Sequence, residues 1–134
     1  MKNASRCIIV FFKDAGTAGD DPTLTLEQAT AVAGTGAKAL TFTTIYTKQG
    51  TLTSVGTWTK ATQAAANTYT DATSAESSAL WAIEVRVDEL DTAGNFDCIR
   101  ISCSDTGILA QLGCALYILE TKHAQATLPS AIAD

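Results

Sequence analysis

The segment ALWAIEVRVDELD, residues 79–91, decides the fold class. One face carries a tryptophan, an isoleucine and two valines, at positions 81, 83, 85 and 87. The other face carries Glu84, Arg86 and Asp88, so apolar and charged side chains alternate from residue 83 to residue 88. Successive side chains of a β-strand point to opposite faces, so this two-residue period predicts a strand with one buried face and one charged face. Strands of this kind are typical of antiparallel sheets.

The same alternation recurs earlier in the chain. In TLTLEQA, residues 23–29, leucines alternate with polar side chains. In ALTFTTIYT, residues 39–47, Leu40, Phe42 and Tyr46 share one face and threonines fill the other. Threonine-rich alternation predicts strands with one wetted face.

Two apolar runs predict strands of a different kind. CIIVFF, residues 7–12, is apolar on both faces, which predicts a strand covered on both sides. ALYIL, residues 115–119, predicts a final buried strand, and Trp58 is expected to point inward from a short strand. About seven short strands separated by turn residues predict an all-β chain, a single-domain antiparallel β-sandwich or jelly-roll-like barrel spanning residues 1–134. Residues 123–134 are expected to form an extended C-terminal arm.

The stretch NFDCIRISCSDTG, residues 95–107, holds more reactive side chains than any other. Strand alternation places Cys98 and Cys103 on opposite faces, so they cannot bind one metal or form one bond without breaking the strand. We therefore predict a strand, paired with residues 79–88, in which Arg100 faces the charged outer row.

The four cysteines form no CxxC pair and have no zinc-site spacing. Each lies in an apolar stretch, and a domain of this size can fold without disulfide bonds or bound metals. Reduced thiols in the core are therefore expected, and two disulfide bonds are the alternative. The residues concerned are Cys7, Cys98, Cys103 and Cys114.

Composition limits the partners. The 134 residues are 46% hydrophobic and 17% charged, with a formal net charge of −5. An acidic chain whose basic residues are scattered singly is repelled by nucleic acid and by anionic lipid, so neither is expected as a partner. No run approaches the ~18 apolar residues that cross a bilayer, and the run at 7–12 is too short for a signal peptide.

Catalytic patterns are not found. His123 is the single histidine, and no GxSxG motif surrounds a serine. Residues 34–38, GTGAK, lack the spacing of a phosphate loop, and the aspartates at 14, 20 and 21 match no calcium loop. The chain is therefore expected to be no enzyme and to hold no cofactor or metal.

Six stretches together resemble a family of small head-associated virion proteins of tailed bacteriophages. They are FKDAGTAGDDPTLTLEQATAVAGTGAKAL, TQAAANTYTDA, IEVRVDELD, FDCIRISCSDTG, AQLGCALYILE and PSAIAD, and they cover nearly the whole chain. The resemblance implies a non-enzymatic structural protein, a capsid cement or decoration protein that binds the major capsid protein. It would be assembled in the host cytoplasm and lie on the capsid surface of the virion.

Capsid sites lie on symmetry axes, so the resemblance also implies self-association, as a homotrimer at three-fold positions. Expected contact residues are Leu128, Pro129 and Ile132 of the arm and the outer row of Glu84, Arg86 and Asp88. Two alternatives remain: a head-tail connector or a tail or fibre component, and a carbohydrate-binding β-sandwich module. The second predicts clustered exposed aromatic residues, whereas both tryptophans are expected to be buried.

Overall fold

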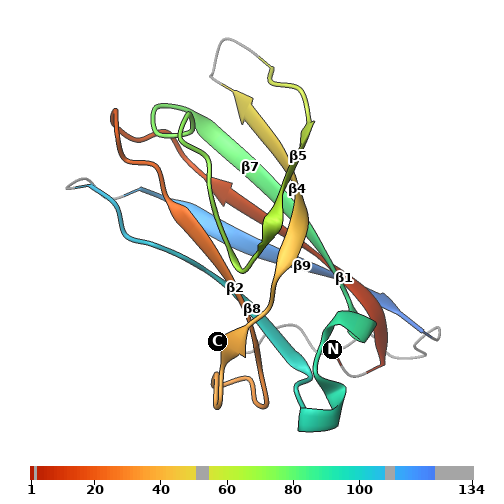
Figure 1. Ribbon diagram of the computed structural model, residues 1–134. Helices are drawn as coiled ribbons and strands as arrows, with labels where there is room; N and C mark the ends of the chain where they lie inside the picture. The colour runs from red at the N-terminus through yellow and green to blue at the C-terminus, as the bar shows by residue number, and fades with distance from the viewer. Residues whose placement is uncertain (2, 51–54, 108–110, 123–134) are drawn as a thin grey trace.

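The computed structural model describes residues 1, 3–50, 55–107 and 111–122, and it is a sandwich of two antiparallel β-sheets (Figure 1). The large sheet has the strand order β5-β4-β7-β1-β9. Its strands are β1 (Ala4–Lys13), β4 (Phe42–Gly50), β5 (Thr59–Ala66), β7 (Ser78–Arg86) and β9 (Gly113–Thr121). The predicted all-β sandwich is confirmed.

The small sheet is built around β2 (Thr23–Ala29). Along its whole length β2 pairs on one side with β8 (Cys98–Cys103). On the other side it pairs with the two short strands β3 (Lys38–Ala39) and β6 (Thr68–Thr70). The small sheet is therefore narrower than the large sheet.

The core lies between the two sheets. The alternation in 79–91 places Trp81, Ile83 and Val85 on the inner face of β7, where all three are buried. Trp81 packs beside Phe11 of β1, with ring centroids 6.1 Å apart. After β7 the chain forms the 3-10 turns η1 (Val87–Glu89) and η2 (Thr92–Gly94), and Asn95 ends the second turn in the left-handed conformation.

The predicted pairing of residues 95–107 with 79–88 is wrong. β8 is a strand, but both sides of β7 are occupied, by β1 and by β4. The turns η1 and η2 instead carry the chain across to the small sheet, where β8 pairs with β2. Arg100 consequently faces Glu27 of β2, and its Nε donates a hydrogen bond to a Glu27 carboxylate oxygen at 2.7 Å.

The two apolar runs are also less buried than predicted. From Cys7 to Lys13 of β1, alternate residues are buried, and the residues between them are only partly buried. β9, drawn in blue in Figure 1, lies at the edge of the large sheet and is exposed along its whole length. The reason is architectural: no layer of described residues covers the outer face of the large sheet.

Two aromatic predictions fail for local reasons. Trp58 precedes β5 and is 48% exposed. In β4 an irregularity between Phe42 and Thr44 shifts the alternation, so that Ile45 is buried and Tyr46 is exposed. The four cysteines are unpaired, as predicted, but only Cys7 is a buried core thiol.

Candidate contact surface

The most unusual surface of the molecule is the outer face of the large sheet. Strand alternation brings apolar side chains from three neighbouring strands onto it, in register. Ile8 of β1 pairs with Ile118 of β9, and Val10 pairs with Leu116. We call this the outer apolar face; it comprises Ile8, Val10, Phe12, Leu80, Ala82, Leu116 and Ile118.

Its side chains pack beside one another but have no second layer above them. The residues of β1 and β7 on this face are half-buried by their sheet neighbours, and Leu116 and Ile118 at the edge are exposed. Contiguous exposed apolar patches are typical of surfaces that contact other molecules.

One end of the outer apolar face is bordered by charges. Arg6 lies between Glu84 and Glu120: its Nη1 is 3.5 Å from a Glu84 carboxylate oxygen, and its Nε donates a hydrogen bond to Glu120. The pKa of Arg6 is raised, chiefly by the hydrogen bond to Glu120. Next to this group Arg86 donates a hydrogen bond to Asp88 at 3.2 Å. Exposed ion pairs of this type add little to the stability of the fold.

The structure thus brings together three of the expected contact residues. Glu84 and Arg86 lie on the outer side of β7, and Asp88 follows in η1, within reach of Arg86. The other three, Leu128, Pro129 and Ile132, lie outside the described residues.

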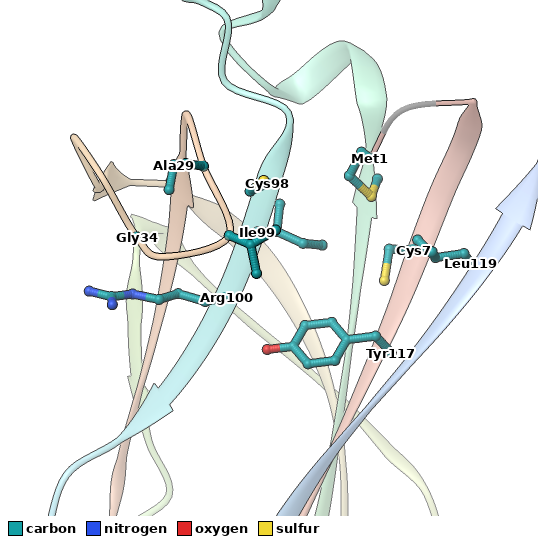
Figure 2. Close-up of a pocket in the computed structure, with 11 residues that line it drawn as sticks. Met1, Cys7, Ala29, Gly34, Cys98, Ile99, Arg100, Tyr117 and Leu119 are labelled. Carbon is teal, nitrogen blue, oxygen red and sulfur yellow. The ribbon is translucent and has the colours of Figure 1, made fainter. Parts of the chain in front are cut away.

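On the opposite, inner side of β9 a cleft of about 230 Å³ opens between the edges of the two sheets (Figure 2). Tyr117 and Leu119 of β9 face it from the large sheet, and Ile99 of β8 faces it from the small sheet. The Tyr117 hydroxyl accepts a hydrogen bond from the backbone N–H of Ile101 at 2.9 Å and so bridges the two sheet edges.

The cleft contains thiols, but they are poorly suited to nucleophilic chemistry. Burial raises the pKa of Cys7, and burial together with the neighbouring Asp97 raises the pKa of Cys98. Both thiols are therefore held in the protonated, unreactive form. Among residues 1, 3–50, 55–107 and 111–122, no group of His, Cys, Asp and Glu side chains is placed to hold a metal ion.

A second cleft, of about 310 Å³, contains a residue that the sequence reading missed. Lys13 ends β1 on its inner face and is buried. Its Nζ donates hydrogen bonds to the Ala75 carbonyl at 2.9 Å and to Gln111 at 3.5 Å, and burial lowers its pKa. The signal was present in the sequence, because Lys13 has the same strand parity as Cys7 and Phe11.

No protein-family model matches the chain, and no curated protein or solved structure is detectably similar to it. In the described part of the chain, no helix is long and apolar enough to span a bilayer.

Proposed function

We propose that this chain is a non-enzymatic structural protein of a bacteriophage virion, a cement or decoration protein that binds the major capsid protein through the outer apolar face. The observation that supports a macromolecular partner is the uncovered outer apolar face, which has charged residues along one end. Protein interfaces have this organisation, with an apolar core and a polar rim. The virion setting rests on the sequence resemblance.

Such a function requires a rigid scaffold and a broad surface more than it requires a pocket. The large sheet supplies both, because its inner face is fixed by the buried core and its outer face is free to contact a neighbour. Binding to the assembled shell and not to its dissociated subunits stabilises the shell by mass action.

The test is co-sedimentation with capsids from which accessory proteins have been stripped. We expect saturable binding of the wild-type chain, and at least a tenfold loss of affinity for Val10→Lys, because an ammonium group would be buried among apolar side chains without a partner. Val32→Lys is the matched control, since Val32 is 95% exposed in the loop between β2 and β3. Equal binding of all three proteins would exclude the outer apolar face as the contact surface. Absence of binding by the folded wild-type chain would refute the capsid proposal.

A second candidate follows from two exposed aromatic residues at neighbouring strands, Tyr46 and Trp58. Tyr46 lies on β4, and Trp58 directly precedes β5, which pairs with β4. Exposed aromatic rings are what a carbohydrate-binding module requires. A change in tryptophan fluorescence on titration with a glycan, lost in Trp58→Ala, would favour this function; an unchanged signal across a glycan panel would exclude it.

A further inference from the structure

β9 forms an open edge of the large sheet, and this edge could bind a partner whether or not the chain binds a capsid. β9 is nine residues long and pairs with β1 on one side, while no other strand of the described residues pairs with its second side. Natural edge strands are guarded by lysine, proline, bulges or short length. β9 contains no lysine and no proline, and its one charged residue is Glu120.

The backbone of β9 is oriented for a second partner. The Leu112 carbonyl accepts a hydrogen bond from the Asp14 N–H at 2.8 Å, and the Lys122 N–H donates to the Asn3 carbonyl at 2.9 Å. Even-numbered residues therefore direct their backbone groups toward β1. Because these directions alternate along a strand, Ala115, Tyr117 and Leu119 direct theirs toward the open edge.

The side chains of β9 are exposed on both faces of the sheet. Leu116 and Ile118 on the outer face are 58% and 48% exposed, and Tyr117 and Leu119 on the inner face are 39% and 53% exposed. A pairing strand would thus cover apolar surface on both sides at once.

We propose that two copies of this chain pair through β9, antiparallel, about a two-fold axis at Tyr117. This register pairs residues 114–120 of the two copies, and it places Leu116 opposite Ile118 on the outer face and Tyr117 opposite Tyr117 on the inner face. It also keeps the two Glu120 carboxylates roughly 20 Å apart, at ~3.4 Å per residue along the strand, so that no like charges meet. The resulting pairs are Tyr117 with the partner's Tyr117, Leu116 with the partner's Ile118, Ala115 with the partner's Leu119, and Cys114 with the partner's Glu120.

The exposed area indicates a weak dimer. At roughly 200 Å² for a fully exposed large residue, the four residues present on the order of 400 Å² per copy, or about 800 Å² in total, which is less than the ~1,000 Å² of a stable interface. A two-fold axis through paired edge strands is perpendicular to the sheet, so both outer apolar faces lie on the same side of the dimer. The two copies could then contact one surface together.

The register makes a specific prediction for a thiol at position 120. Cys114 and Glu120 are even-numbered, so they form a pair without hydrogen bonds to the partner strand, with Cα atoms ~4.5 Å apart. That separation permits a disulfide. In Glu120→Cys, mild oxidation should therefore give a covalent dimer linked between Cys114 and the introduced thiol of the partner.

Glu84→Cys is the matched control, because Glu84 also lies on the outer side of the sheet and also pairs with Arg6, but it is on β7, away from the edge. We expect a majority of linked dimer for Glu120→Cys, little for Glu84→Cys, and none for Glu120→Cys combined with Cys114→Ser. Peptide mapping identifies the bond.

The mass of the wild-type chain in solution supplies the second readout. Light scattering should show a dimer that dissociates on dilution, and Leu116→Lys should weaken it at least tenfold. A monomer at all concentrations would mean that no second copy pairs with β9, and a trimer would indicate a head-to-tail ring. Either result would overturn the proposal. Equal cross-linking of Glu84→Cys and Glu120→Cys would overturn it as well.

Discussion

Two adjacent isoleucines of β1 test whether the outer face of the large sheet is uncovered. Ile9 points into the core and is 0% exposed, whereas Ile8 lies on the outer apolar face and is only partly buried. Truncating Ile9 to alanine removes three buried carbons, at ~0.8 kcal/mol each, and leaves a cavity in the core. We expect Ile9→Ala to lower the free energy of unfolding by about 3–4 kcal/mol. Ile8→Ala opens no closed cavity and should cost about 1 kcal/mol.

The measurement is urea denaturation at low micromolar protein concentration, followed by the fluorescence of the buried Trp81. The two variants change the same residue type in the same strand. The difference between their losses of unfolding free energy therefore reports whether a second layer covers the outer face. Equal costs for Ile8→Ala and Ile9→Ala would refute the reasoning, because they would show that the outer face is packed in the isolated protein.

Three further predictions concern other parts of the molecule. The pKa of Asp91 is lowered, first by its hydrogen bond with Lys38, so its contribution to stability is present above the ordinary aspartate pKa and is lost as the pH falls through the lowered value. Below about pH 4, acid titration should therefore destabilise the wild-type chain more than Asp91→Asn; parallel curves would contradict this. At pH 8, alkylation followed by mass spectrometry should label the exposed Cys114 in the native state and label Cys7, which is buried with a raised pKa, only on unfolding. Gln28 is buried and accepts a hydrogen bond from the Asp91 N–H at 2.9 Å, so Gln28→Ala should lower the free energy of unfolding by about 1–3 kcal/mol in urea, and a smaller loss would show that water replaces the side chain.

The strands were predictable because their alternation is local. Burial alternates residue by residue along β7, and it does so along β2 from Thr23 to Gln28. Strand partners are not local. The turns η1 and η2 send β8 to the small sheet, and nothing in residues 95–107 distinguishes pairing with β7 from pairing with β2.

The outer apolar face was not predicted from the sequence, for a related reason. The apolar outer residues of β1 and β9 were visible in the sequence, but an apolar run implies burial only if a second layer exists. Whether one exists depends on the number of strands in each sheet, which no single stretch encodes. The charged face of Glu84, Arg86 and Asp88 was predictable because these residues alternate with apolar ones. The burial of Lys13 was not predicted, because Lys13 follows the last residue of an apolar run.

The orientation of the protein on a decorated capsid tests the account most directly. Electron cryo-microscopy of stripped capsids saturated with the chain would resolve which side of the sandwich meets the shell. We predict that the outer apolar face, with Ile8, Val10 and Phe12, lies against the major capsid protein. Density in which this face points to solvent, or capsids that carry no added density, would contradict the account.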